Sequence, residues 1–362
     1  MHNHSQREIT YIEAIREAFD LCLNEDENVI IIGEGVPDPK AIFNSTKGLQ
    51  EKYGADRVFD MPLAENGVTG ICIGAALSGM RPVMIHQRID FALLSLDQII
   101  NNAAKWRYMF NNQSSVPIVI RLIVGRGWGQ GPQHSQSLQA LFAHIPGLKV
   151  VMPATPADAK GMLISAIRDN DPVIFIEHRW LHNTVDQVPE SVYEIPLSQA
   201  RIVQEGDCLT LATFSYMLVE SIMAVNALKR ILGLHVELID MRSARPLDVE
   251  TVQKSVRKTG RLVVADTGHT FSGIASELIA SITEREFESL KCAPARVCSP
   301  DVPAATAPSL TKKYYPTPLD IASAIVVQCG MEMSKEQVAS LQDSLEAKTP
   351  HDVPYNNFKG PF

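Results

Sequence analysis

Apolar residues along this chain occur in two patterns, short continuous runs and longer stretches with helical spacing. The run Val29–Gly33 stops at a glycine and is typical of a strand buried on both faces of a parallel sheet. The segment Ile9–Leu23 has helical spacing, and Thr10 with Glu13 forms a capping-box pattern at its start. Helices are also expected at 65–80 and 91–109, and strands at 82–85, 116–124, 149–152 and 172–177. This alternation predicts an α/β domain with a mostly parallel sheet.

The periodicity fades between about 182 and 198, where two prolines and several polar residues predict a linker. Alternation then resumes, with strands expected at 208–213, 235–240, 262–265 and 295–297 and helices at 217–232, 247–259, 273–284 and 318–329. We therefore expect two α/β domains with mostly parallel sheets. Their predicted bounds are 1–185 and 199–330, joined by a linker at 186–198. A tail at 331–362 follows, with one helix at 335–348.

Composition narrows the class of protein. The chain has 362 residues, is 45% hydrophobic and has a formal net charge of −8, which argues against a general nucleic-acid binder. Its six cysteines form no C-x-x-C pair, so a zinc site with cysteine ligands is not expected. Their low density predicts a protein of a reducing compartment. The first residues lack an apolar signal segment, and no run of about 18 apolar residues occurs. These features predict a soluble, cytoplasmic protein without a membrane span.

Two stretches contain candidate chemistry. In VFDMPLAENGVTGICIGAA, Glu65 opens a glycine-rich helix, where the helix dipole stabilises a carboxylate. The plain alternative is an ordinary charge in a first helical turn. In GRGWGQGPQHSQ, four glycines allow close backbone approach to a ligand, and His134 at the end is a candidate acid, base or anion binder. Here the alternative is a surface loop with an incidental histidine. His86 and His178, near strand ends, are expected to be structural.

In order along the chain, several segments resemble one known family. They include the first stretch above and the end of the second, GPQHSQ, together with GEGVPDPKAIFNSTKGLQEKYGADR, DFALLSLDQIINNAAKWRYM, VPIVIR, HIPGLKVVMPATPADAKGMLISAIRDNDPVIFIEH and IDMRSARPLD. The chain resembles the β subunit of the thiamine-diphosphate-dependent 2-oxoacid dehydrogenase first component (E1), whose members act on pyruvate, branched-chain 2-oxoacids or acetoin. The resemblance spans 9–324. It implies a transketolase-like pyrimidine-binding domain followed by a transketolase C-terminal-like domain.

The resemblance assigns roles to four residues. Glu65 matches the glutamate that hydrogen-bonds N1′ of the cofactor's aminopyrimidine and so favours the tautomer that deprotonates the thiazolium. Phe91 matches the aromatic residue that packs against the pyrimidine, and Gln87 is a further expected cofactor contact. His134 matches the histidine at the substrate end of the site. Glu34 and Asp97 are polar candidates near the site, with a structural role as the alternative.

A structural potassium site is a further implication of the resemblance. The positions that hold this ion in some relatives match Ile118, Ala166, Ile167, Asp169 and Asp171. Most of these ligands are backbone carbonyls, and an asparagine often stands in the family where this chain has Asp171. The alternative is an ordinary helix C-terminus.

The chain lacks one motif of thiamine enzymes, the Gly-Asp-Gly run with a downstream Asn-Asn that holds the diphosphate and Mg²⁺. Oxygen ligands for Mg²⁺ are chemically required, so the resemblance implies an α subunit that supplies them. We expect a heterotetramer of two α and two β chains with thiamine diphosphate shared between them. A symmetric contact between β chains and docking of a lipoyl acyltransferase (E2) are also expected.

Some loops depart from the family pattern. Gln87-Arg88-Ile89 is more polar than usual, and the glycine-rich loop contains Arg126 and Trp128. Two alternatives to oxidative decarboxylation of a 2-oxoacid such as pyruvate therefore stay open. One is a transketolase-like carboligase that acts on an aldehyde or keto-sugar acceptor in a biosynthetic pathway, and the other is a non-catalytic scaffold. A nucleotide-binding protein is disfavoured because no G-x-G-x-x-G follows an early strand and no Walker A motif occurs.

Overall fold

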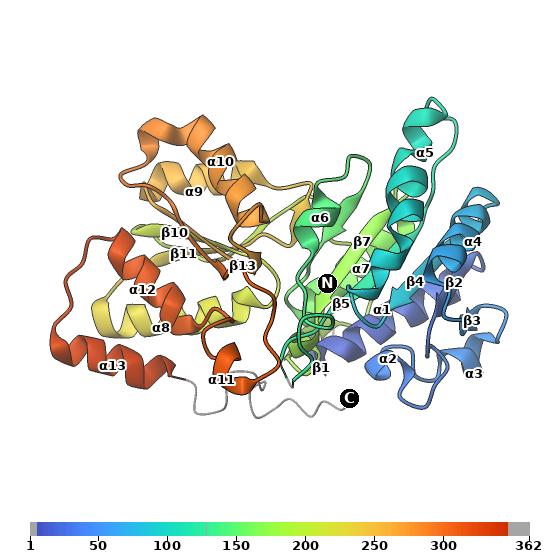
Figure 1. Cartoon of the computed structure of the whole chain (residues 1–362), viewed down its shortest axis with the longest axis horizontal. Helices are drawn as coiled ribbons and strands as arrows, with labels where there is room; N and C mark the ends of the chain where they lie inside the picture. The colour runs from blue at the N-terminus through green and yellow to red at the C-terminus, as the bar shows by residue number, and fades with distance from the viewer. Residues whose placement is uncertain (1–5, 128, 347–362) are drawn as a thin grey trace. The chain divides into compact units, whose positions relative to one another are not determined.

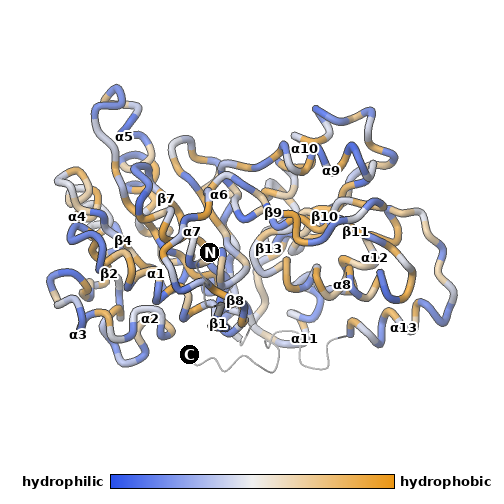
Figure 2. Tube along the Cα trace, turned by 180° about the vertical axis from the view of Figure 1, so that it is seen from behind, coloured by the Kyte–Doolittle hydropathy of each residue, from blue (hydrophilic) through white to orange (hydrophobic). Residues whose placement is uncertain are grey.

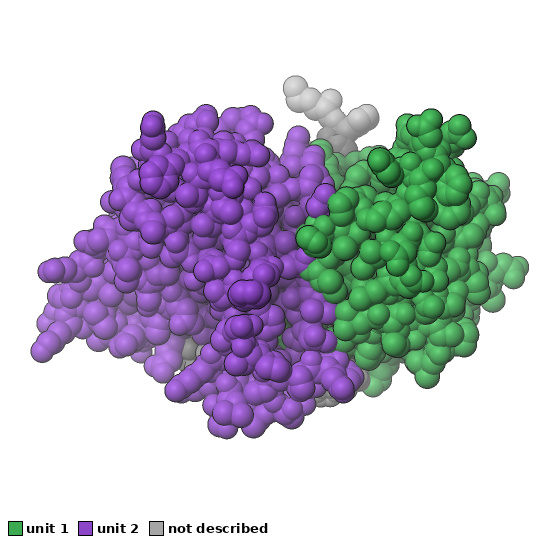
Figure 3. All heavy atoms as spheres, turned by 45° about the horizontal axis from the view of Figure 1, so that its top comes forward, with its two compact units in different colours: residues 1–126, 141–197, 356–362 green, residues 127–140, 198–355 purple. Residues whose placement is uncertain are grey.

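The computed structural model describes residues 6–127 and 129–346. Their contacts divide the chain into two compact units, coloured separately in Figure 3. Of the described residues, unit 1 contains 6–126 and 141–197, and unit 2 contains 127, 129–140 and 198–346. The segment 127–140 thus groups with unit 2, although it falls inside the first domain expected from the sequence. The exact domain bounds stay a prediction.

Unit 1 is built on a parallel sheet in which six of its strands pair in the order β6-β7-β5-β4-β2-β3 (Figure 1). These strands are β2 (Val29–Gly33), β3 (Val58–Phe59), β4 (Arg81–His86), β5 (Val119–Val124), β6 (Lys149–Val151) and β7 (Val173–His178). A separate antiparallel pair joins β1 (Gln6–Thr10) to β8 (Val185–Pro189). The strand β8 lies at the start of the expected linker, where its exposed, polar residues gave no strand signal.

Helices cover both faces of this sheet. They are α1 (Tyr11–Glu25), α2 (Ala41–Asn44), α3 (Leu49–Tyr53), α4 (Glu65–Leu77), α5 (Ala104–Met109) and α7 (Pro156–Arg168). On one face, Phe19 of α1 lies against Arg121 of β5; on the other, Thr69 of α4 contacts Met84 of β4. Arg121 pairs with Ile85, the neighbour of Met84, and successive strand residues point to opposite faces. α1 and α4 therefore lie on opposite sides. The capping box predicted for Thr10 and Glu13 is confirmed.

The segment 91–109 was expected to be one helix, and it is helical throughout, but its hydrogen bonding changes along the segment. It forms a 3₁₀ turn η1 (Phe91–Ser95), a π-helical turn η2 (Gln98–Ala103) and then α5. Ser95, Ile99 and Ala103 are buried at intervals of four residues, a spacing close to that of one α-helical face, and it does not mark where the hydrogen bonding changes. The hydrophobic pattern therefore cannot distinguish the three helix types. π-turns inside helices are rare and often occur at functional sites.

Unit 2 contains a five-stranded sheet in the order β14-β13-β10-β11-β9, parallel except for the edge strand β9. Its strands are β9 (Arg201–Gln204), β10 (Leu209–Thr213), β11 (Val236–Asp240), β13 (Leu262–His269) and β14 (Ala295–Ser299). The main helices are α8 (Met217–Leu232), α9 (Val249–Thr259), α10 (Ile274–Glu286), α12 (Pro318–Gln328) and α13 (Lys335–Leu345). Each expected strand and helix of this half is present. The fold class predicted from the sequence is confirmed.

The central strands of both sheets form the cores. Every residue of β2, β10 and β11 is buried, which explains the continuous apolar run of β2, and Figure 2 shows hydrophobic colour along the central strands. The strands β10 and β11 also bury polar residues, among them Thr210 and Glu237. Among the described helices, none is long and apolar enough to cross a membrane.

Candidate active site

Polar residues that follow adjacent strands of unit 1 meet at the carboxyl edge of its sheet. Glu34 follows β2, Asp60 follows β3 and Gln87 follows β4. The amide Nε2 of Gln87 donates to the carbonyl of Glu34 over 3.0 Å, and the backbone N–H of Gly35 donates to Oδ1 of Asp60 over 2.9 Å. Ligands of open α/β sheets bind outside the carboxyl ends of the strands, so this edge is the candidate site.

Gly35 is needed for these loops to come together. Its φ of +75° lies in the left-handed region, and a Cβ there would lie 3.0 Å from Nε2 of Gln87. A larger residue would strain the backbone and displace the Gln87 side chain. In the sequence GEGVPDP, Gly35 therefore allows Gln87 to lie beside Glu34. The need for glycine comes from this tertiary contact.

Glu65 occupies the first position of α4 and is only 9% exposed. Its backbone carbonyl accepts a hydrogen bond from Oγ1 of Thr69 (2.7 Å), and Thr69 in turn bonds Oγ of Ser95 (3.0 Å). This chain of contacts ties the start of α4 to η1, whose first residue is the half-buried Phe91. Glu65 and Phe91 are thus held on two elements that pack against each other.

No described residue donates a hydrogen bond to the carboxylate of Glu65. The residue as a whole is 9% exposed, but its carboxylate oxygens are not among the fully buried atoms that lack a partner, so they stay open to a ligand. A pyrimidine nitrogen that carries a proton would supply such a donor. This observation fits the role that the sequence resemblance gives to Glu65.

Several acidic groups interact at this edge. Burial raises the pKa of Glu34, and the nearby carboxylates of Glu65, Asp60 and Asp38 raise it further. Like charges at short range disfavour simultaneous ionisation. The arrangement therefore favours the neutral form of Glu34 relative to an isolated glutamate, as perturbed carboxyl groups at functional sites often show.

His134 belongs to unit 2 and is exposed. Its loop is fixed to that unit by three contacts. Tyr315 accepts from the N–H of Gly127 over 3.2 Å, Nε2 of Gln139 donates to Oδ1 of Asp266 over 2.7 Å, and Gly131 packs directly against Thr306. His134 and Glu65 thus belong to different units.

Asp266 explains how this loop is anchored. Its carboxyl group is fully buried at β13, which raises its pKa, while Gln139 and nearby backbone N–H groups lower it in part. The contact between Asp266 and Gln139 joins positions 127 residues apart, so no local signal indicated it.

A buried ionic network behind the edge was also missed. Arg121 donates to both carboxylate oxygens of Glu177 (2.5 and 3.2 Å), and His182 contacts the same carboxylate at 2.9 Å. Arg121 holds the pKa of Glu177 near 2 despite full burial. The sequence did contain a signal for this pair. Arg121 and Glu177 each stand inside an apolar strand, VIRLIV and VIFIEH, and buried charges in proteins are normally paired.

The expected potassium ligands lie at the opposite, amino edge of the sheet, before β5 and β7. The carbonyls of Ile167 and Asp169 both accept from Nη1 of Arg81 at 3.0 Å. The carbonyl of Ile118 accepts from the N–H of Val173, and that of Ala166 accepts from the N–H of Asp169.

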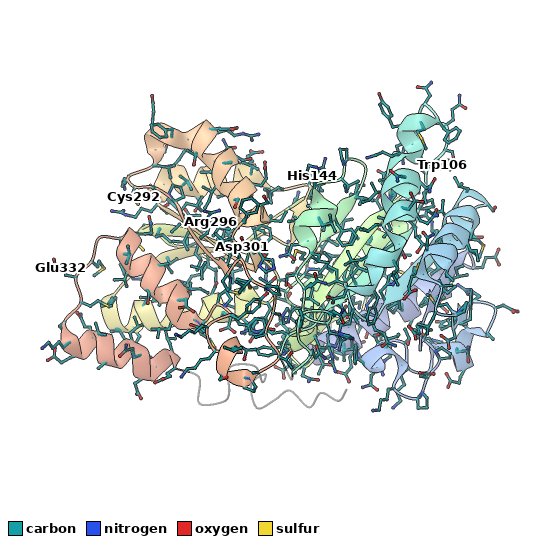
Figure 4. All side chains as sticks on the ribbon, viewed as in Figure 1. Trp106, His144, Cys292, Arg296, Asp301 and Glu332 are labelled. Carbon is teal, nitrogen blue, oxygen red and sulfur yellow. The ribbon has the colours of Figure 1, made fainter. Side chains whose placement is uncertain are left out.

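Basic side chains also neutralise the two carboxylates. Lys149 pairs with Asp169, and Arg107 pairs with Asp171, both at 2.5 Å. A potassium ion would have to compete with Arg81, Lys149 and Arg107 for these oxygens. The potassium site stays a prediction. A cavity of about 1020 Å³ beside them is lined by Arg107, Lys149 and Asp171 together with the end of α5, the helix on which Figure 4 labels Trp106.

Comparison with known proteins places the chain in a family. The model of the transketolase pyrimidine-binding domain matches residues 7–184, and that of the transketolase C-terminal domain matches residues 198–321. A solved structure titled "Split gene transketolase, inactive beta4 tetramer" matches with a TM-score of 0.71 over 90% of this chain and 99% of that one. At 21% identity, this match supports the fold alone. The chain is thus a two-domain protein of the transketolase-like class.

Sequence relatives are more specific. The β subunit of acetoin:2,6-dichlorophenolindophenol oxidoreductase from Cupriavidus necator is 43% identical, over 88% of this chain and 96% of that protein. The β subunit of the pyruvate dehydrogenase E1 component from Bacillus subtilis is 42% identical, over 81% and 90%. The chain belongs to the family of 2-oxoacid dehydrogenase E1 β subunits, as its motifs indicated.

Proposed function

We propose that this chain is the β subunit of a heteromeric, thiamine-diphosphate-dependent 2-oxoacid dehydrogenase E1. The complex would oxidatively decarboxylate a 2-oxoacid such as pyruvate in the cytoplasm and transfer the acyl group to lipoamide. The observation that supports this most directly is Glu65, a nearly buried carboxylate without a described donor at the start of α4. The chain's family membership indicates the cofactor, thiamine diphosphate, whose pyrimidine would contact Glu65.

When bound, thiamine diphosphate supplies a carbon nucleophile, the deprotonated C2 of its thiazolium ring. The residues of this chain would orient the pyrimidine and control its protons. Glu65 would accept a hydrogen bond from N1′ and hold the proton there, since burial strengthens such a bond. Phe91, on the adjacent η1, would pack against the pyrimidine face. Gln87, fixed by its bond to Glu34, would provide a further polar contact.

His134 would act at the substrate end of the site, as an acid or a hydrogen-bond donor to the oxoacid. Its loop has a built scaffold in unit 2, with anchors at Gly127, Gly131 and Gln139 on either side of it. Such anchoring supports a positioned rather than an incidental histidine. We accordingly propose a domain division at 1–185 and 199–330. The loop that contains His134 lies within the first domain in sequence, but its contacts are with unit 2.

We propose that an α subunit holds the diphosphate and Mg²⁺, in a heterotetramer of two α and two β chains with a contact between β chains. The described residues contain no cluster of three or more acidic, histidine or cysteine groups suited to a metal. On and beside α4, Leu63, Ile71 and Leu94 expose large apolar side chains, as subunit contacts do. A lipoyl acyltransferase would be a further partner.

A second candidate is a carboligase that joins the cofactor-bound fragment to an aldehyde or keto-sugar acceptor. Arg88 and Arg126 favour it, because both follow strands at the carboxyl edge of unit 1 and together supply two cations, whereas pyruvate carries one carboxylate and a phosphorylated acceptor would add a second anion. Product analysis separates the two candidates. Acyl-lipoamide supports the dehydrogenase, and a new carbon–carbon bond supports the carboligase.

The decisive variant is Glu65→Gln in the complex of this chain with its α subunit. Loss of proton control should lower pyruvate decarboxylation at least about 100-fold, as general acid–base groups typically contribute. Glu27→Gln, at an exposed glutamate between α1 and β2, is the matched control and should retain the wild-type rate. Wild-type decarboxylation by Glu65→Gln would contradict the proposed function.

A further inference from the structure

Three cysteines of unit 2 gather at the amino edge of its sheet. Cys208 directly precedes β10, Cys292 (labelled in Figure 4) lies shortly before β14, and Cys329 follows the last residue of α12. The strands β10 and β14 flank β13 on its two sides. Arg261, directly before β13, donates from Nε to the carbonyl of Gln328 over 2.9 Å, which places the end of α12 at the same edge.

Cys208 and Cys329 contact each other directly. The thiol of Cys208 donates a hydrogen bond to the sulfur of Cys329. Backbone contacts hold the two segments together, because the N–H of Thr210 donates to the carbonyl of Arg261 over 2.9 Å and Arg261 in turn bonds Gln328. Two thiols in hydrogen-bonding contact can reach the disulfide bond length of about 2.05 Å through small rotations of their side chains.

The surroundings make the two thiols chemically different. The hydrogen bond from Cys208 lowers the pKa of Cys329, and the charge of Arg261 lowers it further, while burial opposes the change. The same hydrogen bond raises the pKa of Cys208, as do burial and the charge of Asp207. The C-terminus of a helix disfavours an anion, but Arg261 offsets this effect by donating to one of the last carbonyls of α12. Cys329 is therefore the thiol of the pair that more readily becomes a nucleophilic thiolate.

The other cysteines lack this combination of features. Burial raises the pKa of Cys22, Cys72 and Cys298 to about 12 each, which keeps them as unreactive thiols. Cys292 donates from its sulfur to Oε1 of Gln328 over 2.8 Å. Across residues 6–127 and 129–346, no group of three or more histidine, cysteine or acidic side chains is arranged to hold a metal. The cluster therefore favours thiol chemistry over metal binding.

Both thiols of the pair are accessible to small reagents. Cys208 and Cys329 are half-buried, and each has an exposed neighbour in the chain, Asp207 and Gly330. Thiols that sense oxidants combine a lowered pKa, solvent access and a second cysteine close enough to close a disulfide. In a reducing compartment, disulfides of this kind are transient.

We propose that Cys329 and Cys208 form a peroxide-sensitive pair, in which Cys329 is oxidised first and Cys208 then closes a reversible disulfide. The sulfur of Cys329, as the thiolate, attacks one oxygen of hydrogen peroxide. The O–O bond breaks, a sulfenic acid forms on Cys329, and hydroxide leaves and takes up a proton. The sulfur of Cys208 then attacks the sulfenic sulfur, the S–S bond forms, and the S–O bond breaks to release a second water. Two thiols lose two electrons and two protons in total, and one peroxide is reduced to two waters.

The test treats the purified full chain with an equimolar amount of hydrogen peroxide and then counts free thiols after denaturation. Two of the six thiols should be lost, and dithiothreitol should restore both. Peptide mapping by mass spectrometry without reduction should find Cys208 linked to Cys329. Retention of all six thiols would overturn the proposal, and so would a linkage that contains Cys292.

Variants separate the two steps. Cys208→Ser should stop at the sulfenic acid, which dimedone traps on Cys329. Cys329→Ser should slow the loss of thiols at least about 10-fold, because the nucleophilic thiolate is gone. Cys298→Ser, at a half-buried cysteine of β14, is the matched control and should lose two thiols as the wild type does. Circular dichroism checks that each variant is folded, and disulfide formation in Cys329→Ser at the wild-type rate would contradict the assigned order.

A measurement on the unaltered chain avoids any effect of substitution on folding. Limited alkylation with iodoacetamide at pH 7 should modify Cys329 at least about 10-fold faster than Cys298, since only the thiolate reacts. Equal rates at the two positions would reject Cys329 as the reactive thiol. These measurements need neither thiamine diphosphate nor turnover, so the inference stands or fails independently of the proposed function.

Discussion

Residue by residue, the chemistry of unit 1 depends on how burial changes ordinary side chains. Glu65 is acidic, buried and without a described donor, whereas Arg121 and Glu177 compensate each other completely at greater depth. The first arrangement leaves a group ready for a ligand. The second stabilises the position of β5 relative to β7, since removing either partner would leave an uncompensated buried charge.

His86 leads to a prediction about pH. It ends β4, is buried, has no partner at Nε2, and burial lowers its pKa to about 4. The unfolded chain binds this proton near pH 6.5, so between pH 6.5 and 4 unfolding takes up protons. The free energy of unfolding should therefore fall as pH falls through this window, by about 3 kcal/mol from this group.

Urea unfolding of the complex at several pH values between 7 and 5 measures this effect. His86→Phe should reduce the dependence on pH, with the remaining slope coming from His178 and His182, whose pKa values burial also lowers. His144→Gln, at the exposed histidine labelled in Figure 4, should leave the slope unchanged. An unchanged slope in His86→Phe would reject the prediction.

On the scale of elements, close approaches between backbones fix where helices and strands begin. Gly147, just before β6, has a φ of +98°, and a Cβ there would lie 1.9 Å from the carbonyl oxygen of Ala104 in α5. This contact joins the helix after the π-turn to the start of a strand. It explains why a glycine stands two residues before the start of β6 in the sequence PGLKVV.

Gly147→Ala should consequently destabilise the chain by well over about 2 kcal/mol, since backbone strain and a steric clash add together. Gly79→Ala is the matched variant, because Gly79 has a φ of +100° with no atom within 4 Å of the added Cβ. Its cost should be about 1 kcal/mol. Thermal unfolding of both variants measures the difference, and equal melting temperatures would exclude the clash.

At the scale of the whole molecule, the proposed function requires an α subunit, and helix α4 is the element on which this proposal can be tested. Ile71 is 68% exposed on α4, the helix that starts with Glu65. Apolar side chains in this position are typical of subunit contacts. An interface through α4 would couple assembly directly to the position of Glu65.

Ile71→Asp should therefore weaken association with the α subunit at least about 10-fold while leaving the fold of the chain unchanged. Co-purification and circular dichroism provide the two measurements. Val327→Asp, at a 75% exposed position of α12 in unit 2, is the control for adding a charge to an exposed apolar site. Normal association of Ile71→Asp would show that α4 lies outside the interface.

The sequence by itself determined most of the architecture. Strands buried on both faces favour continuous apolar runs, so β2 was recognisable from its apolar pattern alone, and the Thr10–Glu13 cap was local. The family motifs predicted Glu65, Phe91, Gln87 and His134 as site residues. The roles of these residues stay predictions.

Only the tertiary structure decided which distant groups share an environment. Contacts between segments far apart in sequence produce the hydrogen bond between Gln139 and Asp266 and place Arg179 against Phe43. The turn types within 91–109 depend on hydrogen bonding that the apolar spacing does not encode. Local propensity and periodicity depend on neighbouring residues, whereas burial, charge compensation and pKa shifts depend on everything packed around a group. The sequence therefore indicated which residues of the sheet edge carry its chemistry, but the burial of Arg88 and Arg126 there became visible only in the fold.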